Sequence, residues 1–107
     1  MTTFDDRKNA YESKFAHDET LRFRSVSRRN RLLGAWAAEK LGRSGPEAEA
    51  YALEVIRSDF DEAGDEDVAR KVLADLEAGG AKVDAQEVRR KMDELLIVAA
   101  TQIESET

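Results

Sequence analysis

The chain has 107 residues, of which 41% are hydrophobic and 37% charged, and its formal net charge is −6. This length fits one domain with a modest core, and the composition, with a single Pro, is typical of a helix-rich globular protein. The absence of cysteine excludes disulfide bonds, thiolate metal sites and cysteine nucleophiles. There is no apolar run of about 18 residues and no signal-peptide core, so we expect no membrane insertion and no export.

The charge is distributed unevenly along the chain. Residues 1–18 carry three basic and four acidic side chains. Residues 19–43 carry seven basic and two acidic side chains, and residues 44–107 carry seven basic and seventeen acidic ones. The middle segment is therefore a basic band between a mixed segment and an acidic one. The overall acidity argues against nucleic acid as a partner, because basic contacts to phosphate dominate that affinity.

The first 18 residues contain three aromatic anchors among charges, Phe4, Tyr11 and Phe15, at steps of seven and four. Burying each ring contributes roughly 1.5–3 kcal/mol. Fixing the backbone of about fifteen residues costs on the order of 1–2 kcal/mol for each residue. We therefore expect residues 1–18 to be a flexible arm, disordered when free, that becomes helical in the groove of a partner. The alternative is that the arm folds back as a helix on its own domain.

The boundary between the arm and the rest of the chain is predicted at His17 and Asp18. Asp18 can cap a helix that begins near Glu19, where an acidic side chain also suits the positive end of the helix dipole. His17 is either an exposed residue with no special role or a pH-sensitive position, because imidazole changes charge near neutral pH.

Apolar residues recur at three- and four-residue steps in four later segments, which predicts four helices within residues 19–104. The first ends before Gly42, the second follows a capping box at residues 44–47 and ends near Gly64, and the third ends at residues 79–80. The fourth follows a cap at Asp84, and residues 104–107 are expected to be frayed. Short connections favour antiparallel neighbours, so the predicted fold is all-α, a four-helix bundle. Its core should contain the Leu and Val residues of the stripes together with Phe23, Trp36, Tyr51 and Phe60.

Side chains suited to catalysis are scarce. The chain has one His, no Cys and no Ser in a nucleophile-elbow context. The carboxylates of residues 59–67 lack the spacing of an EF-hand, and residues 42–45 lack the Lys-Ser/Thr of a phosphate-binding loop. We expect neither enzymatic activity nor a metal site.

The basic band allows three interpretations. It is a charged helix face paired with acidic neighbours such as those of the second helix, a docking surface for an acidic partner, or a pocket for nucleotide phosphates. The sequence does not separate the last two. Its arginines are Arg22, Arg24, Arg28, Arg29 and Arg31. For a nucleotide site the candidates are Arg24, Arg28 and Arg31, with Trp36 to stack on the base.

Four blocks of sequence also resemble a known family over essentially the whole chain. They are FDDRKNAYESKFAHDETLRFR, RRNRLLGAWAAEKLG, GDEDV and VRRKMDELL. In order and spacing they resemble the zeta subunit of the alphaproteobacterial F-type ATP synthase, a small inhibitor of its ATPase. The resemblance implies a four-helix protein whose N-terminal segment blocks ATP hydrolysis by the F1 sector.

The resemblance also implies which residues do this. The inhibitory segment would be Thr2 to about His17, wedged between a catalytic pair of F1 subunits and the central stalk. The partner-binding residues would be Phe4, Asp5, Arg7, Ala10, Tyr11, Lys14, Phe15 and His17, with Glu12 as a further polar contact. The protein would be cytoplasmic, peripheral on F1 at the inner face of the membrane, and would need no cofactor. The alternative function is a regulatory module that binds ADP or ATP through the basic band.

Overall fold

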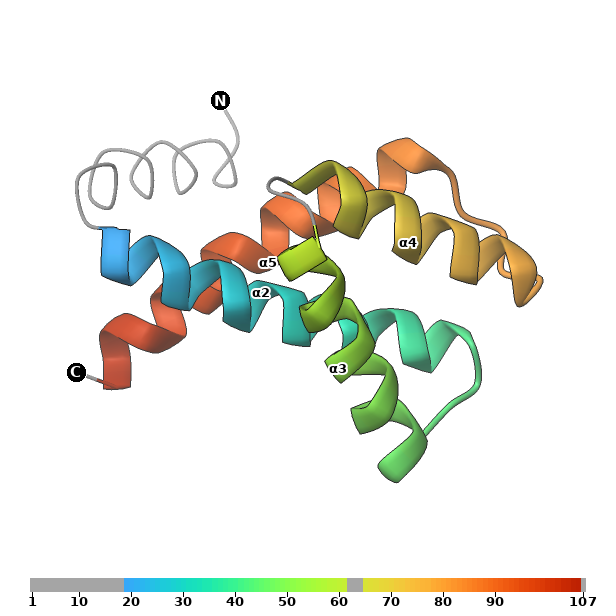
Figure 1. Ribbon diagram of the computed structural model, residues 1–107, viewed down its shortest axis with the longest axis horizontal. Helices are drawn as coiled ribbons and strands as arrows, with labels where there is room; N and C mark the ends of the chain where they lie inside the picture. The colour runs from blue at the N-terminus through green and yellow to red at the C-terminus, as the bar shows by residue number, and fades with distance from the viewer. Residues whose placement is uncertain (1–18, 62–64, 107) are drawn as a thin grey trace.

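The computed structural model describes residues 19–61 and 65–106, without the side chains of Phe60 and Asp61. These residues form four α-helices and no strand (Figure 1). The helices are α2 (Glu19–Lys40), α3 (Pro46–Asp61), α4 (Asp65–Ala78) and α5 (Ala85–Glu106). The predicted all-α fold is thus confirmed. None of the four helices combines the length and the apolar character needed to cross a membrane.

Helix α2 is the centre of the assembly. It contacts α3, α4 and α5, whereas α3 and α5 make no contact with each other within the described segments. In Figure 1, α3 crosses α2 steeply while α5 passes behind it. Helices α3 and α5 are therefore joined through α2 and through α4, which packs against all three other helices.

The buried side of α2 follows four-residue steps through Ser25, Arg29, Leu33 and Ala37. Two of these residues are polar, so apolar periodicity alone does not define the buried side of this helix. The main core joins Leu33 and Ala37 to side chains of the other three helices: Tyr51, Val55, Val68, Val72, Leu76, Val88 and Met92.

The predicted aromatic core is correct only in part. Tyr51 is buried, and Trp36 is partly buried against the core. Phe23 is 64% exposed, so its prediction as a core residue was wrong. The reason is rotational, because Phe23 lies two residues from the buried Ser25, about 200° around the helix. The side chain of Phe60 lies outside the described part of the structure.

The helix ends are set by local hydrogen bonds. Gly42 has φ of 75°, and the amide of Arg43 donates to the Ala38 carbonyl at 2.9 Å, which closes α2 as predicted. At the start of α5, the Glu87 amide donates to Asp84 Oδ1 at 2.8 Å, so Asp84 is the predicted cap.

Two predicted ends differ from the structure. Helix α3 begins at Pro46, and its first turn is closed by the Glu49 amide donating to the Gly45 carbonyl at 3.1 Å, so Gly45 takes the cap position predicted for Ser44. Helix α5 continues to Glu106, so the predicted fraying of residues 104–106 was wrong. The carboxylate of Glu106 pairs with Arg28, which holds the last turn of α5 against α2.

The crossing of α2 and α3 depends on Gly34. A Cβ atom on Gly34 would lie 2.6 Å from the Cα of Ala52, a distance that no real side chain occupies. The two helices therefore approach each other closely at a point where both have small residues. This crossing shapes the surface on either side of it.

Candidate partner-binding surface

The predicted inhibitory residues precede the described part of the chain. They are Phe4, Asp5, Arg7, Ala10, Tyr11, Lys14, Phe15 and His17, and their roles stay predictions. Helix α2 begins at Glu19, directly after this segment.

Arg28 joins α2 to the end of α5. Its Nη2 donates to Glu106 Oε1 at 2.9 Å, its Nη1 pairs with Glu106 Oε2, and the same Nη1 lies 3.5 Å from Gln102 Oε1. The hydrogen bond from Arg28 lowers the pKa of Glu106 and raises that of Arg28. Arg28 is therefore already occupied by a carboxylate of its own chain.

Arg29 is buried, with 1% of its side chain exposed. Its Nε donates to Asn30 Oδ1 at 2.9 Å, and its Nη2 donates to Asp65 Oδ1 at 2.8 Å. Asp65 is in the first turn of α4, where a carboxylate also suits the helix dipole. Within residues 19–61 and 65–106, the acidic partners of Arg28 and Arg29 thus lie on α5 and α4, and not on α3, where such partners were expected.

The four residues predicted to bind a nucleotide do not surround one cavity among the described residues. Arg31 lines a hollow shared with α3, whereas Trp36 has Lys40 at 5.2 Å and Lys91 of α5 at 6.0 Å from its ring centre. Arg24 lies near enough to Glu106 to lower its pKa, and Arg28 pairs with it. Nucleotide binding therefore stays a prediction.

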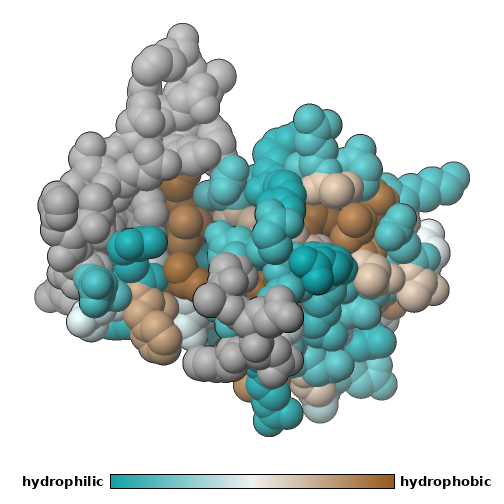
Figure 2. Space-filling model, turned by 45° about the horizontal axis from the view of Figure 1, so that its top comes forward, coloured by the Kyte–Doolittle hydropathy of each residue, from teal (hydrophilic) through white to brown (hydrophobic). Residues whose placement is uncertain are grey.

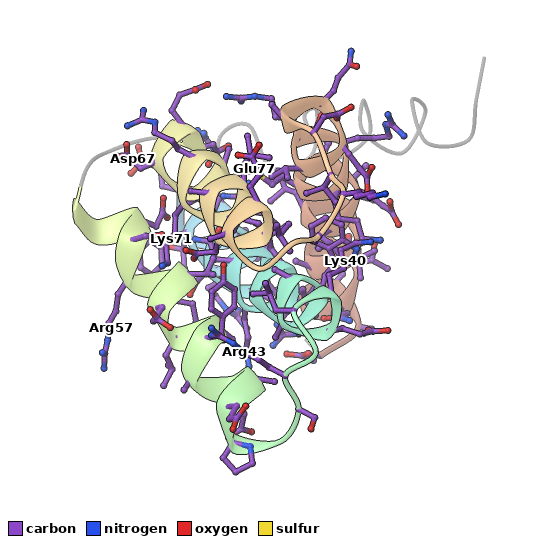
Figure 3. The ribbon with its side chains drawn as sticks, turned by 90° about the vertical axis from the view of Figure 1, so that its right-hand side faces the viewer. Lys40, Arg43, Arg57, Asp67, Lys71 and Glu77 are labelled. Atoms are coloured by element: carbon purple, nitrogen blue, oxygen red, sulfur yellow. The ribbon has the colours of Figure 1, made fainter. Side chains whose placement is uncertain are left out.

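A polar cluster links α3 to α4 around Tyr51. The Tyr51 hydroxyl donates to Asp75 Oδ2 at 2.8 Å, and Lys71 Nζ donates to the same oxygen at 3.1 Å. Arg43 and Lys71 lie 5.3 Å and 5.6 Å from the centre of the Tyr51 ring, and Figure 3 shows the two cations converging from separate elements. Burial, together with the bond to Asp75, raises the pKa of Tyr51. The Tyr51 hydroxyl and the Lys71 ammonium both bond to a carboxylate of the same cluster, which favours a structural role.

A surface groove between α2 and α3, here called the α2–α3 groove, lies beside the basic band. Its larger part has a volume of about 430 Å³. Helix α2 supplies Arg31 and Ala35, and α3 supplies Ala48, Glu49, Ala52, Leu53 and Ile56. A second, much smaller hollow of about 30 Å³ adjoins it nearer the start of α2 and shares Ile56; its other lining residues are Phe23, Val26, Ser27, Asn30 and Asp59.

The acidic residues near the α3–α4 connection do not form a metal site in the described segments, where no group of three potential ligands converges. Figure 2 shows a mainly hydrophilic face in which hydrophobic residues appear as separate areas between hydrophilic ones.

Sequence reasoning missed three features: the burial of Arg29, the exposure of Leu53 and the partner of Arg28. The burial of Arg29 had a signal, since Arg29 is four residues before Leu33 and eight before Ala37, on the buried side of α2. Leu53 lies off the apolar stripe of α3, which indicates exposure. The partner of Arg28 had no signal, because nothing in the sequence relates residues 28 and 106.

Comparison with known proteins identifies the family. The family model described as ATPase inhibitor subunit zeta matches residues 1–102 of the chain. The chain belongs to this family. The resemblance found in the sequence blocks is thereby confirmed, and membership in the zeta family supports a role as an inhibitor of ATP synthase.

The fold of this zeta-family chain is shared with a solved structure. A protein structure determined by solution NMR is 49% identical in sequence, covers 81% of this chain and 99% of its own chain, and has a TM-score of 0.72. No curated protein sequence matches the chain.

Proposed function

We propose that this protein inhibits the F1 sector of ATP synthase by inserting residues 2–17 at a catalytic interface, where they block ATP hydrolysis. The observation that carries the proposal is the extent of the family match. It begins at residue 1 and continues to residue 102, so it includes the arm as well as the helical domain.

The proposed division of labour has a physical basis in the helical part. Its described residues have a core contributed by all four helices, and the ion pairs of Arg28 and Arg29 connect α2 to α5 and α4. These contacts are made without the first 18 residues. A holder of this kind can present an arm whose final shape comes from the partner.

The arm carries its anchors at spacings that suit a helix in a groove. Tyr11 and Phe15 are four residues apart, and Phe4 is seven residues before Tyr11, so a helical arm would present all three on one face. Asp5, Arg7, Glu12 and Lys14 would make polar contacts around them. A helix wedged between a catalytic subunit pair and the central stalk would prevent the opening and closing that hydrolysis requires.

In this proposal the protein catalyses no reaction of its own. It acts by occupying an interface, needs no resident cofactor, and is located in the cytoplasm on the F1 sector. Membership in an inhibitor family supports a non-catalytic role.

The test is titration of F1 ATPase activity with two variants of the full chain. In the first, Phe4, Tyr11 and Phe15 are changed to Ala; in the control, Thr3, Asn9 and Ser13 are changed to Ala. Losing three buried rings should weaken inhibition by at least about a thousandfold, because each contributes roughly 1.5–3 kcal/mol. Undiminished inhibition by the anchor variant would remove the arm from the mechanism.

A further inference from the structure

The α2–α3 groove exists because the two helices cross at small residues. The close approach of Gly34 to Ala52 brings the helix backbones together, and the neighbouring Ala35 and Ala48 are too short to fill the space beside the crossing. The result is the hollow of about 430 Å³. A surface hollow of this volume that is lined mainly by apolar side chains can accept a side chain from another molecule.

The edges of this groove carry the large apolar side chains that are most exposed in the described residues. Phe23 is 64% exposed and Leu53 is 51% exposed, and both line the groove, Phe23 in its smaller part and Leu53 in its larger part. The two residues lie in adjoining hollows that share Ile56, whereas single scattered residues would need no explanation.

The shape of the groove fits one helix. Its larger part is lined along α3 from Ala48 to Ile56, eight residues or about 12 Å, which corresponds to about two turns of a docked helix. A groove between two packed helices is also where the side chains of a third helix interlock. The occupant we favour is therefore helical.

The charges at the two edges differ in sign. The α2 edge carries Arg31, which is exposed and has no ion pair among the described residues, while the α3 edge carries Glu49 and Asp59. A complementary helix would have an apolar stripe with carboxylates on the side facing α2 and basic side chains on the side facing α3. This pattern fixes the direction in which the helix docks.

A helix that is already folded in a partner suits this groove better than the arm of the same chain. The arm would have to be ordered, at a cost of about 1–2 kcal/mol for each residue fixed. A preformed helix avoids that cost. The arm joins α2 at Glu19, and the groove begins four residues later, at a distance of about 6 Å along the helix. Insertion of the arm into a partner would therefore bring the groove close to the same partner.

We infer that the α2–α3 groove is a second docking site, which binds a preformed amphipathic helix of the same ATP synthase assembly that receives the arm. This inference rests on the proposed function. The arm would stop the enzyme, and the groove would hold the inhibitor in place by adding apolar contacts outside the catalytic interface.

The test is inhibition of F1 by full-length variants. In the groove variant, Phe23 and Leu53 are both changed to Asp; in the control, Ala50 and Ala74, which are exposed and line neither hollow, receive the same two substitutions. The groove variant should need at least about tenfold more protein for half-inhibition and still inhibit completely at saturation. The control should match the unmodified chain. Arg31→Glu is a second, milder groove variant that reverses the charge of one edge.

The outcomes separate this inference from the proposed function. Unchanged half-inhibition by both groove variants, with the anchor variant inactive, would overturn the groove and leave the arm in place. Tighter inhibition by a groove variant would mean that the groove binds the arm of its own chain. If the unmodified chain self-associates and a groove variant is monomeric, the groove binds a second copy. Either result overturns the inference. In support, the Phe4, Tyr11 and Phe15 variant should compete with the unmodified chain for F1 without inhibiting.

Discussion

Arg29 and Asp65 form an ion pair in which one partner is buried and the other is in water. The Nη2 to Oδ1 distance is 2.8 Å, with side-chain exposures of 1% for Arg29 and 56% for Asp65. A buried guanidinium that loses its carboxylate keeps its desolvation cost without compensation. The pair therefore fixes the first turn of α4 to the middle of α2.

Asp65→Ala should lower the free energy of unfolding by about 2 kcal/mol, because it leaves Arg29 buried without its carboxylate. The matched control is Glu66→Ala, which removes an exposed pair with Arg89 from the same helix turn and should cost at most about 1 kcal/mol. Urea unfolding followed by circular dichroism measures both. Equal losses would show that the burial of Arg29 has no energetic consequence.

Gly34→Ala should destabilise the domain by about 1–3 kcal/mol, since its Cβ would lie 2.6 Å from the Ala52 backbone and the helices would have to separate. Gly79→Ala is the informative control. Its Cβ would lie even closer to another atom, 2.3 Å, but that atom is Cδ2 of the Leu41 side chain, which can rotate away. Thermal unfolding should therefore rank Gly34→Ala as the more harmful change; the reverse ranking would argue against a tight α2–α3 crossing.

Tyr51 should resist ionisation at alkaline pH. Burial and the bond to Asp75 raise its pKa above the ordinary value of 10.0, so the neutral phenol is favoured in the folded state. This stabilisation is complete below pH 10.0 and is lost as the pH rises through the raised pKa of the folded state. Phenolate absorbance of a Tyr11→Phe variant isolates Tyr51, the remaining tyrosine. A phenolate transition centred at the ordinary value in the folded protein would contradict the buried hydrogen bond.

Glu106 should titrate below its ordinary pKa of 4.5, because the hydrogen bond from Arg28 favours the carboxylate. Its contribution to holding the end of α5 is present above that value and is lost as the pH falls through the lowered pKa. Carboxyl NMR titration measures the midpoint, and Arg28→Gln should move it back toward 4.5. A midpoint that does not respond to the substitution would mean that the pair does not persist in solution.

Much of the fold could be predicted because its signals are local. The stops at Gly42 and at residues 79–80, the cap at Asp84 and the apolar stripes of α3 to α5 depend on residues within a few positions of one another. The family was also recognisable from blocks of sequence, as the match to residues 1–102 confirms.

The failures concern relationships across the fold. Phe23 was placed in the core because of its hydrophobicity, but the buried side of α2 is set by where α3, α4 and α5 lie, and that side includes Arg29. The end of α5 was predicted to fray because residues 104–107 are polar. In the structure, Glu106 is bound by Arg28 of α2, which lies 78 positions earlier in the chain. The α2–α3 groove likewise depends on the crossing at Gly34, which the sequence of either helix alone does not indicate.

The central claim is that a self-sufficient helical domain presents an arm that gains its structure only on the partner. Hydrogen exchange of the full chain, free and bound to F1, tests this most directly. We predict that amides of residues 2–17 exchange without protection in the free protein and become protected on F1, while those within α2 to α5 are protected in both states. Strong protection of residues 2–17 in the free protein, or none in the complex, would contradict the account.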